Sequence, residues 1–352
     1  MESYLTLILF GGFLTLLILG APITVSLAGA SMAAYMLLDK NPIALVQIAF
    51  TSVGNFPLMA LPAFVLAGAL MEAAGISKRL VDIAESLAGP VTGGLGAATV
   101  MACLFFGAIS GSGPATTAAV GMLMVPAMVK RDYDKSYASA VTAASGGLGI
   151  IIPPSIPLVI FGISAMGLMA PPEAIAQHGQ FASLSIPKLF VAGVVPGFIM
   201  ASTLVVTNYF IAKREGYKGL SENWSFGEVR HALRRGIWSI LAPFLILGGI
   251  YSGMFTPTES AVVAIFYSLF VGVFIHRELS FKSTIKSLST TTWITGRVLL
   301  ILFAATVFGR LLIEQKIPVV VAESLLGFTD NMYMVWALTI VLLLFVGMFM
   351  ET

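Results

Sequence analysis

Long apolar stretches alternate with short polar connections along almost the whole chain. Many of these stretches reach the roughly 20 residues that an α-helix needs to cross a lipid bilayer. The pattern therefore predicts a series of helical spans. In chain order they cover residues 5–20, 21–38, 56–74, 189–212, 237–254, 257–275, 294–313, 318–327 and 332–350.

Some connections are themselves amphipathic. Residues 76–87 place Lys78, Arg79, Asp82 and Glu85 on one side of a helix whose other positions are mostly apolar. Residues 279–291 form a second segment of this kind, and residues 42–51 suggest a short interfacial helix. Such helices lie along the membrane surface rather than across it.

Two interruptions stand out within the apolar runs, at residues 107–117 and 145–157. The first lies between apolar arms at 93–110 and 114–129, and the second divides the run 136–167. Glycine weakens a helix, and proline removes a hydrogen-bond donor. Peptide groups freed at membrane depth are tolerated only where they face protein, trapped water or a bound ion. Secondary transporters build their sites from broken helices of this kind, so we expect a transport protein with its ion site here.

Composition supports the same class. The chain is 58% hydrophobic and 10% charged, whereas a soluble domain carries about 25% charged residues. We therefore predict an all-α polytopic membrane protein. Basic residues are scattered in loops, which does not indicate nucleic-acid binding, and the one cysteine, Cys103, leaves no intrachain disulfide. No His-Glu-x-x-His motif, carboxylate pair within a span or Walker motif occurs, so we expect no enzymatic activity.

Most of the 19 lysines and arginines fall in four clusters, at residues 78–79, 130–135, 213–235 and 277–286. An even number of predicted crossings separates successive clusters, which places all of them on one face, and excess basic charge marks that face as cytoplasmic. The N-terminus is then periplasmic, in a bacterial inner membrane. The arms around residues 110–113 start and end on the cytoplasmic face, either crossing fully or forming a re-entrant hairpin.

Three motifs in this order resemble the large membrane (M) subunit of tripartite ATP-independent periplasmic (TRAP) transporters. They are Gly-Ala-Ile-Ser-Gly-Ser-Gly-Pro-Ala-Thr-Thr at 107–117, Gly-Ile-Ile-Ile-Pro-Pro-Ser-Ile-Pro at 149–157 and Gly-Met-Phe-Thr-Pro-Thr-Glu-Ser at 253–260. Sialic-acid systems look nearest, and C4-dicarboxylate systems share the motifs. The resemblance implies an elevator-type fold with inverted repeats, helical hairpins, broken helices and two Na⁺ sites. It also implies two partners, a small four-helix membrane subunit (Q) and a periplasmic substrate-binding protein (P).

The same resemblance suggests a division of the chain. Scaffold spans would occupy residues 1–75, an amphipathic arm 76–90, and a transport domain 91–167. A periplasmic loop, spans and a cytoplasmic connector, mainly scaffold, would occupy 168–278. A second arm, a second hairpin within 304–326 and the start of a second broken helix would occupy 279–352. The family's continuation after Gly347-Met-Phe-Met-Glu-Thr352 is missing, so a C-terminally truncated form with half of the second Na⁺ site is expected.

Na⁺ is a hard cation that prefers oxygen ligands. We expect one Na⁺ to be bound between the hairpin tip and the unwound segment. The candidate ligands are oxygens of Ser110, Ser112, Gly147, Gly149, Ile152 and Pro154. The alternative is close helix packing through small residues, without an ion.

The expected substrate is an organic-acid anion. Candidate partners for its carboxylate are Ser112, Thr116, Thr117, Ser155 and Arg310. The hydroxyl groups could instead bond to their own helix backbone. Glu259 is a functional candidate as a charge at a span, but capping of its helix by Thr256 or Thr258 is favoured.

These features predict Na⁺-coupled uptake of sialic acid or a C4-dicarboxylate by the transport subunit of a tripartite system. The alternative is a stand-alone Na⁺-coupled elevator-type carboxylate transporter. A channel is disfavoured because a single asymmetric pair of interrupted segments does not form a symmetric pore.

Overall fold

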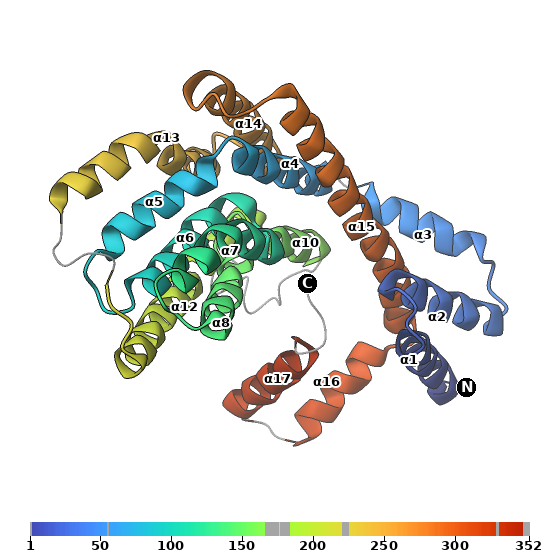
Figure 1. Cartoon of the computed structure of the whole chain (residues 1–352). Coiled ribbons are helices and arrows are strands. Elements are labelled where there is room, and N and C mark those ends of the chain that lie inside the picture. The colour runs from blue at the N-terminus through green and yellow to red at the C-terminus, as the bar shows by residue number, and fades with distance from the viewer. Residues whose placement is uncertain are drawn as a thin grey trace. The chain divides into compact units, whose positions relative to one another are not determined.

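The computed structural model describes residues 2–54, 56–165, 176, 184–219, 225–328 and 331–347. These described residues form helices and turns and contain no strand (Figure 1). The predicted all-α class is therefore confirmed. The chain divides into a smaller unit, Met1–Asn55 with Gly296–Thr352, and a larger unit, Phe56–Thr295.

Among the described residues, five helical stretches are long and apolar enough to cross a bilayer. They are Lys135–Ala165, Ile186–Glu215, Phe226–Tyr251, Pro257–Ile275 and Phe281–Glu314. A bent pair, Ala60–Ala73 with Ile76–Ala88, would make a sixth if taken as one span. The chain is thus a multi-pass membrane protein, as its hydropathy predicts.

The first three helices of the smaller unit and the part of its longest helix around residues 304–311 form an apolar cluster that includes Leu9, Ala34 and Leu311, all fully buried. The ring of Phe308 lies 5.8 Å from that of Phe10. Its helices are α1 (Glu2–Ile18), α2 (Ile23–Leu37), α3 (Ile43–Val53), the second half of α15 (Phe281–Glu314), α16 (Ile317–Phe328) and α17 (Met332–Gly347).

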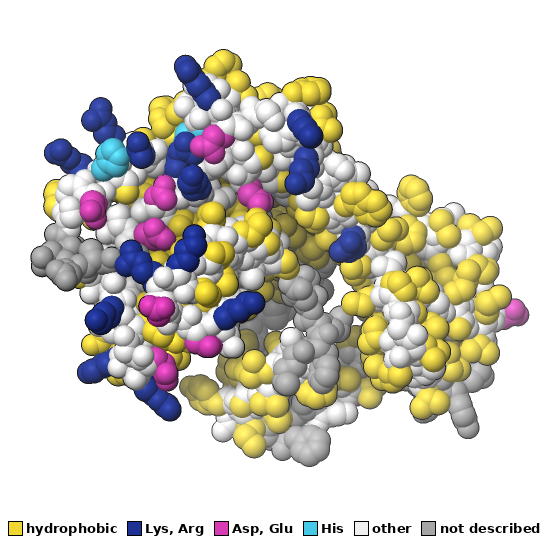
Figure 2. Space-filling model, viewed as in Figure 1, with side chains coloured by type: hydrophobic (Ala, Val, Ile, Leu, Met, Phe, Trp, Pro, Cys, Tyr) yellow, Lys and Arg dark blue, Asp and Glu magenta, His cyan; other side chains and the backbone are white. Residues whose placement is uncertain are grey.

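The larger unit places the amphipathic α5 between α13 and the hairpin formed by α6 and α7 (Figure 1). Its helices before the break are η1 (Phe56–Met59), α4 (Ala60–Ala73), α5 (Ile76–Ala88), α6 (Gly94–Ser110) and α7 (Gly113–Val129). The later ones are α8 (Lys135–Gly146), α9 (Leu148–Ile151), α10 (Ile156–Ala165), α12 (Ile186–Glu215), α13 (Phe226–Tyr251), α14 (Pro257–Phe270) and η3 (Val271–Ile275). Figure 2 shows Lys and Arg side chains gathered over the viewed face of this unit.

Two predicted boundaries were wrong. The span predicted at 237–254 begins earlier, at Phe226, where Ser225 caps α13 by accepting a hydrogen bond from the Glu228 N–H at 3.3 Å. The predicted arm 279–291 and the span after it form one continuous helix, α15, since no glycine or proline separates them.

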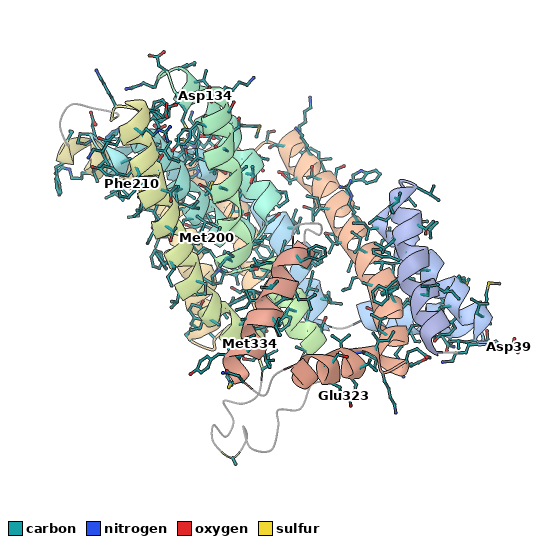
Figure 3. All side chains as sticks on the ribbon, turned by 90° about the horizontal axis from the view of Figure 1, so that it is seen from below. Asp39, Asp134, Met200, Phe210, Glu323 and Met334 are labelled. Atoms are coloured by element: carbon teal, nitrogen blue, oxygen red, sulfur yellow. The ribbon has the colours of Figure 1, made fainter. Side chains whose placement is uncertain are left out.

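The gap predicted between the spans 294–313 and 318–327 is confirmed. It is a turn between α15 and α16, where Lys316 has a φ of 55°. In Figures 1 and 3 these two helices diverge, whereas α6 and α7 lie side by side. Most of the periplasmic loop predicted from residue 168, and residues 348–352 of the last motif, lie outside the described residues.

A junction joins the bend between α4 and α5 to the segment after η3. The bend is 68° and Gly75 occupies it with a φ of 71°. The Arg79 guanidinium donates from Nη1 to the Gly75 carbonyl at 2.9 Å and contacts Glu278 Oε1 from Nη2 at 2.9 Å. His276 Nδ1 lies 2.9 Å from the Ala74 carbonyl, so Nδ1 carries the proton and donates it.

A second polar contact ties α12 to α6 and α8. Asn208 is 2% exposed; its Nδ2 donates to the Gly93 carbonyl at 3.0 Å, and its Oδ1 accepts from the Tyr137 hydroxyl at 2.7 Å. A methyl group on Gly96 would overlap the Asn208 side chain. The close approach of α6 and α12 therefore requires glycine at position 96.

The contact predicts unequal effects of two Gly→Ala changes. Gly96→Ala must displace Asn208 and should cost about 1–3 kcal/mol, the usual penalty of overpacking. Gly248→Ala has open space around the added methyl and should be neutral or stabilise α13 by up to about 1 kcal/mol. Thermal melting in detergent measures both, and equal melting temperatures would contradict the assignment.

A second prediction concerns pH. Burial lowers the pKa of His276 below its usual value of 6.5, although its hydrogen bond to Ala74 opposes the shift. The unfolded chain then binds a proton at a higher pH than the folded chain does, so stability falls as pH drops below about 6.5. Melting temperatures recorded from pH 7.5 downward should fall more for the wild type than for His276→Gln. Parallel curves would contradict this role for His276.

Candidate functional site

The tip of the α6–α7 hairpin is a compact turn of small residues. Gly111 has a φ of 63°, and Ser112 is extended and caps α7, its Oγ accepting from the Ala115 N–H at 3.4 Å. Pro114 stands in the first turn of α7, where its missing N–H costs nothing. The predicted hairpin is therefore present, with its tip at residues 110–112.

The interrupted segment is a broken helix, as predicted. Helix α8 ends at Gly146, one turn of helix forms α9, and Ile152 is extended before α10 begins at Ile156. Between α9 and α10 lies Pro153-Pro154, joined by a cis peptide bond. Ser155 closes the gap, since its Oγ donates to the Ile150 carbonyl at 2.5 Å and accepts from the Leu158 N–H at 3.3 Å.

The structure brings the tip and the broken helix into direct backbone contact. The Ile156 N–H donates to the Gly111 carbonyl at 3.1 Å. A methyl group on Gly107 would lie 2.8 Å from the Gly149 Cα, and one on Gly111 would lie 2.5 Å from the Pro154 carbonyl oxygen. Glycine is required at both positions because the two backbones touch there.

Several peptide carbonyls at this joint lose the donor that a continuous helix would supply. The residues four positions after Ser110, Gly149 and Pro153 are prolines, which have no N–H. A continuous helix would use the N–H groups of Ile156 and Leu158 for the carbonyls of Ile152 and Pro154. Here they donate instead to the Gly111 carbonyl and to Ser155 Oγ. The affected carbonyls belong to Ser110, Gly149, Ile152, Pro153 and Pro154.

The hydroxyl groups at the tip form a directed chain. Thr116 Oγ1 lies 2.7 Å from the Ser112 carbonyl, and Ser110 Oγ lies 3.3 Å from the same carbonyl and 2.9 Å from Thr116 Oγ1. The shorter contact favours Thr116 as the donor to the carbonyl, and Ser110 then donates to Thr116. In this arrangement Ser110 Oγ accepts only a 3.4 Å contact from the Ser112 N–H among the described hydrogen bonds. The Ser112 carbonyl already accepts from the Thr116 N–H and from Thr116 Oγ1, which occupies both of its lone pairs.

The predicted ion-site residues therefore differ in what they can offer. Ser110, Gly149, Ile152 and Pro154 lie at the joint with carbonyls that have lost their helical donors. The Gly147 carbonyl accepts from the Ile150 N–H at 3.3 Å, and Ser112 has only its capping hydroxyl to contribute. Binding of Na⁺ by these residues stays a prediction.

The predicted substrate residues are divided between the two units. Ser112, Thr116, Thr117 and Ser155 lie at or next to the joint, and Thr117 Oγ1 donates to the Gly113 carbonyl at 3.0 Å. Each of the four makes a backbone hydrogen bond, as the alternative interpretation expects. Arg310 lies in the smaller unit, where its Nε is 3.1 Å from Glu314 Oε1.

Glu259 is a capping residue, as favoured from the sequence. Its Oε2 accepts from the Thr256 N–H at 2.8 Å and from Thr256 Oγ1 at 2.9 Å. The Glu259 N–H in turn donates to Thr256 Oγ1 at 3.3 Å, which completes a capping box at the start of α14.

Sequence reasoning missed the part that α12 plays at the site. A methyl group on Gly193 would lie 2.7 Å from the Ile151 carbonyl, and one on Gly197 would overlap the Ile152 side chain. Figure 3 shows α12 beside α8, with Met200 labelled on α12, and Met200 reaches Gly147. The four-residue spacing of Gly193 and Gly197 was the available signal, because it places both on one helix face.

On the other side of the tip lies α4. A methyl group on Gly68 would lie 3.3 Å from the Ser110 Cα. The hairpin tip is therefore enclosed by α4 on one side and by the broken helix on the other.

Comparison with known proteins identifies the family. Residues 10–352 match the family model of the tripartite ATP-independent periplasmic transporter, DctM component. The chain belongs to this family. The resemblance seen in its motifs is thereby confirmed, and its relatives are TRAP transporter permeases rather than enzymes.

Individual relatives are named for different substrates. The isethionate TRAP transporter permease protein DctMQ of Oleidesulfovibrio alaskensis is 40% identical over 345 residues, which are 98% of this chain and 52% of that protein. The C4-dicarboxylate TRAP transporter large permease protein DctM of Rhodobacter capsulatus is 36% identical over 303 residues, 86% of this chain and 68% of that protein. The sialic acid TRAP transporter large permease protein SiaM of Vibrio cholerae is 38% identical over 300 residues, which are 85% of this chain and 66% of that protein. The TRAP permease chain described here thus spans about half to two thirds of these relatives.

The hydroxyl chain gives a test of the site's architecture. Thr116→Val removes the 2.9 Å partner of the Ser110 hydroxyl, which is 4% exposed, and leaves it only the longer 3.3 Å contact with the Ser112 carbonyl. It should destabilise the protein by about 1 kcal/mol. Thr203→Val is the matched control, since Thr203 makes the same type of backbone bond on the exposed face of α12. Thermal melting should separate the two variants, and equal effects would contradict a buried hydroxyl chain.

Proposed function

We propose that this TRAP permease chain carries a small organic-acid anion across the bacterial inner membrane, driven by the Na⁺ gradient. The observation that supports this is the group of peptide carbonyls at the joint between the α6–α7 tip and the broken helix. They belong to helix ends at membrane depth, where an unpaired carbonyl is costly unless an ion or water satisfies it.

The cation would bind where helices α6 and α9 end. The carbonyl ends of helices carry the negative part of the helix dipole, which favours a cation. Ser110 Oγ adds a neutral oxygen with lone pairs free to coordinate. We therefore assign Na⁺ to the carbonyls of Ser110, Gly149, Ile152 and Pro154, together with this hydroxyl.

The anion would bind beside the cation, where α7 and α10 begin. Helix N-termini favour negative charge, and both of these helices start at the joint. Ser112 and Ser155 cap the two helices, and the Ser155 proton is donated to the Ile150 carbonyl. The Ser112 hydroxyl and the two helix dipoles would therefore favour a carboxylate or sulfonate. Bound Na⁺ would lower the cost of bringing this anion into the membrane, which couples the two fluxes.

An elevator mechanism requires the site to move as one body against a scaffold. The packing of Gly193 and Gly197 on the broken helix and the Asn208 contact with α6 support including α12 in the moving body. This differs from the sequence-based division, which placed residues 168–278 mainly in the scaffold.

The expected partners are a small Q subunit and a periplasmic binding protein P that delivers the anion. Substrate classes worth testing are those in the names of the relatives, namely isethionate, C4-dicarboxylates and sialic acid. The basic loops favour a cytoplasmic location for the α4–α5 bend and a periplasmic N-terminus. The second candidate, a stand-alone carrier, would not need P.

The decisive experiment is uptake of these three anions by proteoliposomes with an inward Na⁺ gradient. We expect uptake of one of them only with Na⁺, Q and P present. Uptake that persists without P would favour the stand-alone carrier, and uptake independent of Na⁺ would contradict the proposed coupling.

Substitution of the hydroxyl ligand tests the ion site itself. Ser110→Ala should raise the Na⁺ concentration for half-maximal uptake by about 10-fold, equivalent to about 1.4 kcal/mol of binding free energy. Ser164→Ala is the control, because Ser164 is exposed on α10 and bonds only to the Ile160 carbonyl among the contacts described. An unchanged Na⁺ dependence in Ser110→Ala would remove this residue from the site.

A further inference from the structure

Arg79 occupies an unusual position at the start of the amphipathic helix α5. Its guanidinium binds two acceptors from different parts of the chain, the Gly75 carbonyl and the Glu278 carboxylate, each at 2.9 Å. One acceptor belongs to the bend between α4 and α5, and the other to the segment that leads into α15. The side chain therefore links two connections that are about 200 residues apart in sequence.

The surroundings hold Glu278 in place for this contact. The Gly272 carbonyl accepts from both the Glu278 and the Leu279 N–H groups at 3.1 Å, which orients the turn after η3. Glu278 Oε2 fills the space above Gly75, so that a methyl group there would overlap the carboxylate. His276 adds its hydrogen bond to the Ala74 carbonyl one residue away.

The junction controls the direction of α5. This helix leaves α4 at 68°, packs between α13 and the hairpin, and continues through a short link into α6. A change in the bend would therefore shift the hairpin that carries the candidate ion site. Helix α5 connects α4 to that hairpin along the chain, and the Arg79 contacts lie at the start of α5.

We propose that Arg79 is a positioning residue for transport, which sets the angle between α4 and α5 by binding Gly75 and Glu278 together. The proposal rests on the proposed function, since a fixed angle matters only if α5 links moving and stationary parts. Arginine suits this role because its planar fork reaches two acceptors at once, whereas lysine presents a single ammonium group.

The exposure of the Arg79–Glu278 pair argues against a purely stabilising role. The Arg79 and Glu278 side chains are 21% and 43% exposed, and ion pairs this accessible contribute little to stability. Loss of the pair should therefore leave folding almost intact while it alters the geometry of the bend. Transport and stability should respond differently to the same substitution.

The test uses Arg79→Gln, Glu278→Gln and the double variant in proteoliposomes that hold Q and P, with the anion that the wild type transports. We expect each single variant to lower the maximal uptake rate by about 10-fold with little change in KM or melting temperature. The double variant should lose no more than either single one, because both remove the same contact. Lys78→Gln is the control, an exposed cation next to Arg79.

Wild-type rates in Arg79→Gln would overturn the proposal, as would a loss of rate that follows a matching loss of melting temperature. Additive losses in the double variant would also count against it, since they would mean that the two residues act separately.

A second measurement does not depend on transport. Spin labels at Met59→Cys and Asp82→Cys, both exposed, report the distance across the α4–α5 bend, and the native Cys103 is fully buried. We expect one narrow distance distribution that broadens with Arg79→Gln, and an unchanged distribution would overturn the proposal. Absence of wild-type uptake would reject the proposed function alone, because the spin labels still test the bend.

Discussion

Peptide groups inside a bilayer must be paired within the protein or bound to an ion or water, because lipid offers no hydrogen bonds. This constraint organises the joint between the hairpin tip and the broken helix. Pro114, Pro153, Pro154 and Pro157 withdraw donors from the carbonyls four residues before them. The structure compensates in part, with a backbone bond from Ile156 to Gly111 and a side-chain bond from Ser155 to Ile150. The carbonyls that keep no helical donor belong to the two segments that meet at this joint.

The same joint depends on the absence of side chains. Gly107 meets Gly149, and Gly193 meets the Ile151 carbonyl, at separations that a methyl group would not allow. Close backbone contact through small residues is the usual way in which helices associate in membranes. Here it also joins the backbones of the hairpin tip and the broken helix, including the Ile156 N–H bond to the Gly111 carbonyl. The packing and ion-binding interpretations of the glycines are therefore compatible.

Neutral oxygens, rather than charged side chains, make up this candidate site. Several charges near apolar spans have other partners: Glu259 caps α14, and Glu314 binds both Lys40 and Arg310 in the smaller unit. A carboxylate at membrane depth would have to be desolvated, which is costly unless its pairing is excellent. Peptide dipoles already present at helix ends avoid that cost, and they suit a monovalent cation that must be released again.

Local patterns in the sequence determined the helical class, the amphipathic α5 to within a residue, both hairpin arms and the break after Ile151, since hydropathy and proline chemistry act over a few neighbours. They also anticipated the capping role of Glu259 from a three-residue spacing. Only the tertiary structure decided that α12 backs the broken helix, that the Ser112 carbonyl is already occupied, and that Arg79 meets Glu278. These features depend on chain segments folded against one another, and which groups meet there is set by packing rather than by the residues on either side.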